Sequence, residues 1–475
     1  MSLPRKHHQL HDAPRVEGLV SGGGGSARDV VHGYLAEQVG RFPDLGLEGP
    51  VVAGLDGRDA GLAGAIHHAV MRRWLTLKTV AGHFVNRPWD QVQPEVRGVL
   101  LAGAAQLLLL ERVPDHAVVD EAVRWTKRRV RAKAGGMVNA VLRRVAELRD
   151  EVVAEHDPER RDEMPLSDGR AWRLNKEVFH SDPITRLAEQ TSHPRKLVER
   201  WIGMLGGNAT MELARHSLVH APIVVTGLPE FNPLGNTNPP NPLPGPPPEG
   251  EGMSAHAEEG FFVFEGSRND LTALLEQFPG ARVQDAGSAG PVGMTGDLTP
   301  GLIMDVCAGR GTKTKQLAGL HPEAKIIATD KDDKRRGALR EVFSGSDQVT
   351  VVEFTDLDTY AGRADLLILD VPCSNTGVLA RRVEAKYRQN EKYLADLVEL
   401  QRRIVTGARA LLSSGGSVLY ATCSIEPREN GGQAAWMGKE MGLEVGEARM
   451  GMPRGLPGEE ASGYADGWYG CLMQG

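Results

Sequence analysis

Short apolar runs alternate with amphipathic segments through the last third of the chain. Runs with the length and composition of buried strands occur at residues 302–306, 324–329, 349–354, 364–369 and 417–421. Helical periodicity in residues 312–320 and 391–412 places helices between strands, so the strands can lie parallel in one sheet. This pattern predicts a doubly wound α/β fold for residues 291–475.

Residues 27–150 have a different, helical periodicity. Apolar residues recur at the spacing of a helix face, for example at Val30, Tyr34, Ala63, Ile66 and Val70. Residues 99–110 form a nearly continuous apolar segment that is long enough for a buried helix. Val113-Pro114 interrupts the pattern, and Asp115 is placed to cap the next helix. We expect an all-α bundle in this region.

The remaining segments are polar or biased in composition. Residues 1–26 include four consecutive glycines and are expected to form a flexible tail. Residues 151–230 are charged and mostly helical in pattern, with a short strand expected at residues 219–226. Residues 232–251 are rich in Pro, Asn and Gly, and we expect an extended loop that acts as a passive spacer.

Two thiols and a carboxyl group follow two of the predicted strands. Asp370 and Cys373 come after residues 364–369, and Cys423 comes after residues 417–421. The carboxyl ends of parallel neighbours meet at one edge of a sheet, where such folds bind ligands. A thiolate is a strong nucleophile that can add to C6 of a cytosine and make C5 accept a methyl group, if a carboxyl group supports N3. The alternative, that both cysteines are small buried hydrophobic residues, is less consistent with strand ends flanked by hydroxyl residues.

A turn of small residues follows the strand predicted at residues 302–306. The turn, residues 307–311, leads into a helix, and such a loop lets the backbone approach a ligand closely. Asp330 ends the next strand, where an acidic residue meets the ribose in dinucleotide-type folds. Asp356 follows the third strand. Either aspartate alone is compatible with helix capping, but their position at successive strand ends favours a ligand.

Length and composition limit the number of domains and the cellular compartment that we expect. A chain of 475 residues with 41% hydrophobic residues is expected to form two or three globular domains. It has no apolar run of about eighteen residues, and its first residues lack the apolar segment of a signal peptide, so no membrane association is expected. Its four cysteines show neither a disulfide framework nor a zinc-ligand spacing. Free thiols without a metal fit a cytoplasmic protein.

The charge of the chain calls for local basic patches if it binds nucleic acid. The net charge of −7 argues against indiscriminate binding to phosphates. A cationic run follows Trp125, comprising Lys127, Arg128, Arg129, Arg131 and Lys133. The run is interpreted either as a solvated helix face or as a surface that contacts phosphates, and the pattern alone does not separate the two.

The strand-end segments resemble the motifs of a known family. The segment Asp370-Val-Pro-Cys-Ser-Asn-Thr-Gly377, with Arg381-Arg382 and Lys386-Tyr387 behind it, is similar to the fourth motif of RNA cytosine-5 methyltransferases of the Nop/Sun type. Residues 421–427 with Glu429-Asn430 are similar to the sixth motif, and residues 305–314 to the first. The paired cysteine motifs are specific, whereas the glycine-rich first motif alone is weak evidence.

The N-terminal part strengthens the resemblance. Residues 114–122 and 138–143 are similar to a NusB-type RNA-binding domain, and the combination occurs in bacterial rRNA methyltransferases. The resemblance covers most of the chain outside residues 232–251 and the extreme N-terminus. It implies an all-α NusB-like domain at residues 27–150, a linker with a small RNA-binding subdomain at residues 151–290, and a Rossmann-like class I methyltransferase domain at residues 291–475.

The resemblance also implies a reaction and its residues. The reaction is methylation of C5 of a cytidine in RNA, in small-subunit rRNA, with S-adenosylmethionine as cofactor and the chain acting as a monomer. Cys423 is implied as the nucleophile, Asp370 as the support for N3, and Cys373 as the residue that assists release. The implied cofactor-binding residues are Cys307, Ala308, Gly309, Arg310, Gly311, Thr312, Lys313, Asp330, Asp356 and Asp370. The implied RNA-binding residues are Lys127, Arg128, Arg129, Arg131, Arg381, Arg382 and Lys386.

Two departures keep other functions open. The first motif has Arg310 and Thr312 where the family usually has proline and glycine, and residues 221–226 lack the arginine–asparagine signature of the RNA-binding subdomain. Both favour a non-catalytic RNA-binding or ribosome-assembly factor that retains the fold, whereas Cys373, Cys423 and Asp370 oppose it. Amino-group methylation is a further alternative, and Cys373 opposes it because an aromatic residue is expected there to stack on the base.

Overall fold

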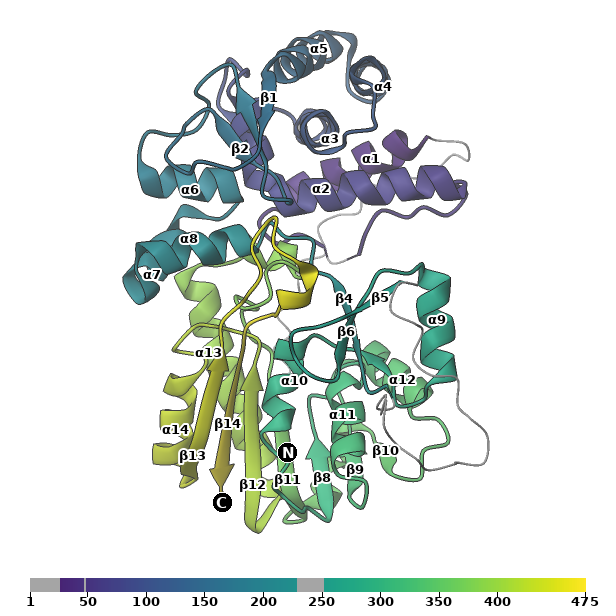
Figure 1. Cartoon of the computed structure of the whole chain (residues 1–475), viewed down its shortest axis with the longest axis vertical. Helices are drawn as coiled ribbons and strands as arrows, with labels where there is room; N and C mark the ends of the chain where they lie inside the picture. Colours follow the sequence, from purple (N-terminus) through teal and green to yellow (C-terminus); the bar gives the residue numbers. More distant parts are fainter. Residues whose placement is uncertain (1–25, 47, 229–251) are drawn as a thin grey trace. The chain divides into compact units, whose positions relative to one another are not determined.

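The computed structural model of the chain describes residues 26–46, 48–228 and 252–475 (Figure 1). These residues fall into two compact units. The first unit comprises the chain up to His220, Leu379–Asn390 and Leu456–Gly458. The second unit comprises Ala221–Val378, Glu391–Gly455 and Glu459–Gly475. The chain therefore leaves the second unit after Val378, in the segment behind Cys373, and returns to it at Glu391.

Two predicted segments fall largely outside this description. The tail expected at residues 1–26, except Ser26, and the spacer expected at residues 232–251 lie outside the described residues. Among the helices that the structure describes, none is long and apolar enough to cross a membrane.

The core of the first unit is a helical bundle, as the periodicity predicts. Its helices are α1 (Ala27–Arg41), α2 (Gly57–Gly82), α3 (Pro94–Leu109), α4 (Asp115–Arg129) and α5 (Ala132–Glu147). The apolar segment at residues 99–110 lies in α3, which is buried along most of its length. A Cβ atom at Gly98 would lie 2.7 Å from the backbone nitrogen of Ala36, so glycine lets α3 approach α1 closely. Asp115 begins α4 but forms no side-chain cap, and instead pairs with Arg149.

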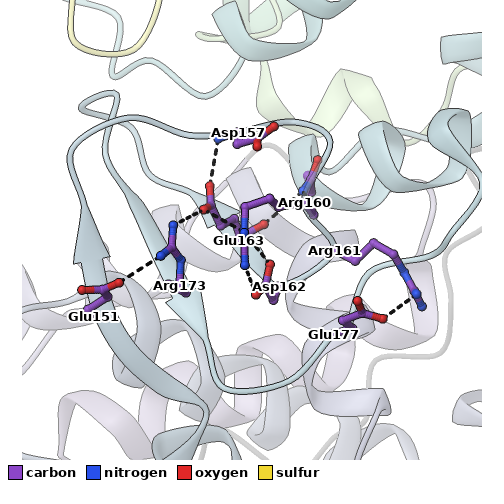
Figure 2. Close-up of polar contacts among 9 residues, drawn as sticks. Glu151, Asp157, Arg160, Arg161, Asp162, Glu163, Arg173 and Glu177 are labelled. Carbon is purple, nitrogen blue, oxygen red and sulfur yellow. Dashed lines mark hydrogen bonds and ion pairs between the residues drawn. The ribbon is translucent and has the colours of Figure 1, made fainter.

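The rest of the first unit contains a small antiparallel sheet that the helical pattern of residues 151–230 does not predict. The elements are β1 (Arg149–Val153), β2 (Glu163–Pro165), β3 (Ala171–Leu174), α6 (Pro183–Thr191), α7 (Arg195–Leu205) and α8 (Gly207–His216), with β3 in the middle of the sheet. The strands are too short and too charged for a readable alternation of apolar and polar positions. Figure 2 shows that Glu163 accepts hydrogen bonds from Arg173 (2.9 Å) and from the backbone of Asp157 (2.8 Å).

The second unit is built on a seven-stranded mixed sheet. Its strands are β8 (Leu302–Asp305), β9 (Lys325–Ala328), β10 (Val349–Val351), β11 (Ala364–Asp370), β12 (Leu412–Thr422), β13 (Glu444–Gly451) and β14 (Trp468–Gln474). The order is β10-β9-β8-β11-β12-β14-β13, with β14 antiparallel to both of its neighbours and the strands from β10 to β12 parallel. The predicted doubly wound α/β fold is therefore confirmed.

Helices cover both faces of this sheet. Side chains alternate along its central strands, so apolar residues point to both faces and pack against these helices. Leu366 and Ile368 of β11 belong to a core with residues of α10 (Ala286–Gly293), α11 (Thr312–Leu320) and α12 (Asp333–Val342). Leu367 and Leu369 belong to a second core with residues of α13 (Glu391–Ala408) and α14 (Gly431–Met441).

A smaller sheet precedes this fold. Its strands are β4 (Ile223–Thr226), β5 (Met253–Ala255), β6 (Phe261–Phe264) and β7 (Arg282–Val283), in the order β5-β6-β4-β7, and α9 (Arg268–Gln277) packs on it. The strand predicted at residues 219–226 is thus shorter and begins at Ile223.

Candidate active site

The two cysteine motifs meet at adjacent strand ends. β11 and β12 are parallel neighbours, and Asp370 is in register with Ala421. Cys373 and Cys423 therefore leave the same edge of the sheet, and their Sγ atoms lie 3.2 Å apart. Both thiols are free, with Cys373 buried and Cys423 partly exposed. The Cys423 thiol also donates to Oδ1 of Asn375, at 3.3 Å. The structure thus brings together the two thiols that the sequence places at strand ends.

The carboxylate at the same strand end is paired with a lysine. Nζ of Lys313, in the first turn of α11, lies 2.9 Å from Oδ2 of Asp370. Burial disfavours the charge of Lys313, but the carboxylate of Asp370 outweighs this effect and raises the pKa of the lysine. The pair therefore holds a cation and an anion at the sheet edge that carries the thiols.

The small-residue turn is tied to Asp330. Gly309 and Gly311 have left-handed backbone angles, with φ of 60° and 89°, which glycine adopts without strain. The backbone N–H of Gly309 donates to Oδ2 of Asp330 at 3.0 Å. Asp332, and not Asp330, caps α12, so the capping alternative does not apply to Asp330.

The other residues expected around the cofactor are placed differently. Arg310 is exposed, so its side chain does not fill the turn. Asp356 is exposed in a 3-10 turn and accepts a hydrogen bond from Thr355 (3.3 Å). In the described part of the chain, no hydrogen bond or ion pair joins Asp356 to the turn at residues 307–311. Burial raises the pKa of the Cys307 thiol, which keeps it protonated, so its backbone is the part available to a ligand.

Sequence reasoning missed Asp305, although it lies in the strand predicted at residues 302–306, and it ends β8. Its side chain is buried, and Oδ2 accepts a hydrogen bond from the hydroxyl of Thr314 at 2.7 Å. Oδ1 has no partner among the described residues. Burial raises the pKa of Asp305 to about 7. A buried carboxylate oxygen that lacks a donor beside this turn fits a site whose ligand supplies a polar hydrogen.

The expected RNA-binding residues divide into two groups. Lys127, Arg128, Arg129 and Arg131 are exposed around the end of α4, and Arg382 is exposed. Arg128 pairs with Asp29 at 2.8 Å. Lys386 is fully buried in the first unit, where its Nζ lies 3.4 Å from the carbonyl oxygens of Arg72 and Ser217. The Lys386 side chain is therefore not on the surface.

The segment around Lys386 is anchored in the first unit. The Tyr387 hydroxyl donates to the carbonyl of Met71 (2.7 Å) and accepts from the backbone N–H of Trp74 (3.2 Å). These partners are more than 300 positions away in sequence, so no local pattern could have indicated them.

Glu429 is the second functional candidate that sequence reasoning missed. It follows the Cys423 motif, its side chain is buried, and it accepts hydrogen bonds from Ser374, Ser424 and Gln401. Its position beside an asparagine in the sixth motif was the available signal. Among the described residues, no group of three His, Cys, Asp or Glu side chains is placed to hold a metal ion.

Known protein families match two parts of this chain. Residues 298–441 match the family model of the 16S rRNA methyltransferases RsmB/F, and residues 46–147 match that of the NusB family. Ribosomal RNA small subunit methyltransferase B of Erwinia tasmaniensis is 26% identical over 394 residues, which cover 78% of this chain and 80% of the relative. The protein of the same name from Escherichia coli O6:K15:H31 (strain 536) is 26% identical over 445 residues, which cover 87% and 91%.

A solved structure supports the fold. The crystal structure of PH0851 has a TM-score of 0.62 and 20% identity, and the match covers 89% of this chain and 92% of that chain. The predicted combination of a NusB-type domain with a methyltransferase domain that uses S-adenosylmethionine is confirmed by these matches. The methyltransferase domain of this chain is therefore similar to the RsmB/F family of 16S rRNA methyltransferases, and its helical domain is similar to the NusB family.

Proposed function

We propose that this chain methylates C5 of a cytidine in small-subunit rRNA through a covalent bond between Cys423 and C6. The observation that carries the proposal is the pair of thiol sulfurs 3.2 Å apart at the ends of β11 and β12. Methylation of a base nitrogen or a ribose does not require two thiols. Addition to C6 followed by elimination uses one as the nucleophile and the other to assist release.

The residues take the following roles. The Cys423 thiolate forms the S–C6 bond as N3 takes up a proton, which turns C5 into a nucleophile, and Asp370, held by Lys313, accepts a hydrogen bond from the protonated N3. S-adenosylmethionine supplies the electrophilic methyl group that C5 accepts. C5 then gives its proton to water, the S–C6 bond breaks so that the C5–C6 double bond forms again, and N3 releases the proton that it gained. Cys373 assists this elimination, and Cys423 leaves as a thiolate.

The residues near the small-residue turn fit the cofactor. Asp330 is held against the backbone of Gly309 and suits the ribose hydroxyls. The unpaired Oδ1 of Asp305 suits a donor such as the amino group of the methionine part. Lys313 and the backbone at residues 307–311 line the same turn. The exposed Arg310 leaves the turn open, so the departure from the family pattern does not block the site.

The substrate must present an unstacked base. Reaching C5 and C6 requires extrusion of the nucleotide, which costs a few kcal/mol from a duplex and less from a single strand. We therefore expect loose or partly assembled rRNA to be a better substrate than the folded small subunit. The exposed residues Lys127, Arg128, Arg129 and Arg131 are the proposed phosphate contacts of the helical domain.

Two alanine variants test the mechanism. Cys423→Ala should give neither methylated RNA nor a covalent adduct. Cys373→Ala should form the adduct and accept the methyl group but stall before elimination. The stalled species would appear on a denaturing gel as a slow, RNase-sensitive band that retains the methyl label. The double variant should lose this band. An adduct from Cys423→Ala would reverse the two roles.

A non-catalytic assembly factor is the second candidate, favoured by the absence of the arginine–asparagine signature at residues 221–226. Calorimetry with S-adenosylmethionine separates the two functions. Absence of binding at high cofactor concentration, together with absence of methyl transfer to any rRNA, would favour the assembly factor.

A further inference from the structure

The two cysteine loops share one buried acceptor. Oε1 of Glu429 accepts from the backbone N–H of Ser374 (2.9 Å) and from Nε2 of Gln401 (2.9 Å). Oε2 accepts from the hydroxyls of Ser374 and Ser424, the latter at 2.6 Å. Each serine directly follows one of the two cysteines in the sequence. One carboxylate thus holds the residue behind Cys373 and the residue behind Cys423.

The hydrogen bonds around Glu429 have a definite direction. Each serine hydroxyl has one proton, and both protons point to the carboxylate, since its oxygens can only accept when it is ionised. The Ser374 and Ser424 oxygens, 3.0 Å apart, then have no proton between them. Ser424 also accepts the backbone N–H of Glu426 at 3.0 Å. The carboxylate is therefore the element on which the serines converge.

Glu429 is itself fixed from the sheet through its backbone and from α13 through its carboxylate. The Tyr420 hydroxyl on β12 donates to the Glu429 carbonyl at 2.7 Å. Gln401 on α13 donates to both Glu429 and the Pro372 carbonyl (3.0 Å), so it ties the carboxylate to the start of the Cys373 loop. Glu429 consequently has no freedom to follow either cysteine loop away from the other.

We propose that Glu429 is a positioning residue that holds the Cys373 and Cys423 thiols together through Ser374 and Ser424. This role deepens, and rests on, the proposed covalent mechanism. Without the carboxylate, the loops lose their common acceptor, and the sulfur that assists release is no longer held beside the sulfur that attacks. Glu429 touches neither sulfur, and it acts through the two serines.

The charge of Glu429 can be tested separately from its hydrogen bonds, through the pKa of the Cys373 thiol. The neighbouring Cys423 and burial raise the pKa of the Cys373 thiol, and the nearby carboxylate of Glu429 raises it further. A variant that keeps the contacts but removes the charge should therefore lower the pKa of Cys373. A change in a fold-supporting residue elsewhere would not produce this shift.

Glu429→Gln and Glu429→Ala separate contacts from charge. In Glu429→Gln, the amide oxygen can take the place of Oε1, and the amide nitrogen can donate to both serine hydroxyls. The displaced hydroxyl protons can then bridge Ser374, Ser424 and Thr376, whose oxygens lie 3.0–3.2 Å apart. Glu429→Ala removes every contact of the carboxylate and leaves the backbone hydrogen bond from Tyr420 in place. Glu163→Gln in the first unit is the matched control, because Glu163 is a buried glutamate far from both cysteines in sequence.

The thiols can be tested on the intact protein without RNA. Phenylarsine oxide bridges two neighbouring thiols through arsenic with loss of one water. The wild type, Glu429→Gln and Glu163→Gln should bind it equally, whereas Glu429→Ala and the double variant Ser374→Ala/Ser424→Ala should bind about tenfold or more weakly. Glu429→Gln should also show a lower pKa for Cys373 when alkylation is followed against pH. Circular dichroism and cofactor binding show whether the variants fold.

The outcomes separate this proposal from the proposed function. Wild-type arsenical binding by folded Glu429→Ala overturns the positioning role. Equal weakening in Glu429→Gln and Glu429→Ala also overturns it, because charge rather than contact would then matter. If the binding pattern holds but the wild type methylates no RNA, the positioning role stands and the proposed function fails.

Discussion

Two buried glutamates, one in each unit, are held by different kinds of partner. In the first unit, Glu163 is 1% exposed and pairs with Arg173 and Arg160, whose side chains are 34% and 42% exposed (Figure 2). In the second unit, Glu429 is fully buried and accepts from neutral donors, with no cation paired to it among the described residues. Burial raises the pKa of Glu429, although the serine hydrogen bonds oppose this effect.

The difference indicates what each carboxylate does. The arginines neutralise Glu163 and reach solvent, so its charge links β2 to β3 without a field that acts further away. The charge of Glu429 is not neutralised by a cation and therefore acts on the thiols beside it. A buried carboxylate with an arginine partner supports the fold, and one held by neutral donors at a strand end is a candidate for chemistry.

Asp305 provides the largest expected effect, because it is a second carboxylate of this kind in the methyltransferase unit. Burial raises its pKa from 3.8 to about 7, so the folded protein keeps a proton that the unfolded chain has lost. The free energy of unfolding should therefore fall as pH rises from about 4 to about 7, by about 4 kcal/mol at most. Asp305→Asn should remove this decrease.

Urea titrations of the cofactor-free protein at several pH values measure this decrease in the free energy of unfolding. The same pH dependence in Asp305→Asn and in the wild type would show that Asp305 is ionised normally.

Glu163→Ala tests the buried glutamate that is paired with arginines. It leaves the Asp157 backbone N–H without its acceptor and removes the ion pair with Arg173, so the free energy of unfolding should fall by about 2–3 kcal/mol. Arsenical binding at the cysteine pair should not change. Chemical denaturation measures the loss in the free energy of unfolding. Weakened arsenical binding in Glu163→Ala would show that Glu163 and Glu429 are not independent in function.

Asp330→Ala tests a carboxylate that holds a backbone loop and is proposed to bind the cofactor. Loss of hydrogen bonds to the ribose and to Gly309 should weaken S-adenosylmethionine binding about tenfold or more. Isothermal titration calorimetry measures the affinity, with Asp356→Ala as a comparison at the neighbouring strand end. Unchanged affinity in Asp330→Ala would remove Asp330 from the site.

Lys386→Met tests the reverse case, a buried cation in the first unit without a carboxylate partner among the described residues. Burial and the nearby Arg72 and Arg73 lower the pKa of Lys386, so the unfolded chain binds a proton that the folded chain disfavours. The wild type should gain stability as pH rises towards the ordinary lysine pKa, and Lys386→Met should lack this gain. At pH 7 the variant should be more stable by about 1 kcal/mol. A less stable variant would show that the two carbonyl contacts outweigh the cost of burial.

Local pattern is sufficient for much of the fold and for the thiols. The apolar runs that become β8, β9, β11 and β12 bury both faces, so their hydrophobic character is visible within five or six residues. Once the strands are located and taken as parallel, the residues that follow them lie at the same edge of the sheet. The sequence alone therefore places Asp370, Cys373 and Cys423 at one edge. The short charged strands β1 to β3 carry no such signal, and the mostly helical prediction for residues 151–230 is wrong where β2 and β3 form.

The sequence by itself therefore determined the two kinds of domain, the parallel arrangement of the central strands and the edge that carries the thiols. Only the tertiary structure decided which polar groups meet. Ser374 and Glu429 are 55 positions apart, and Tyr387 and Met71 are 316 apart. Hydrophobic periodicity repeats every two to four residues and reports which face of an element is buried. The partner of a buried carboxylate, hydroxyl or ammonium group depends on which elements pack together, and that is set by the whole chain.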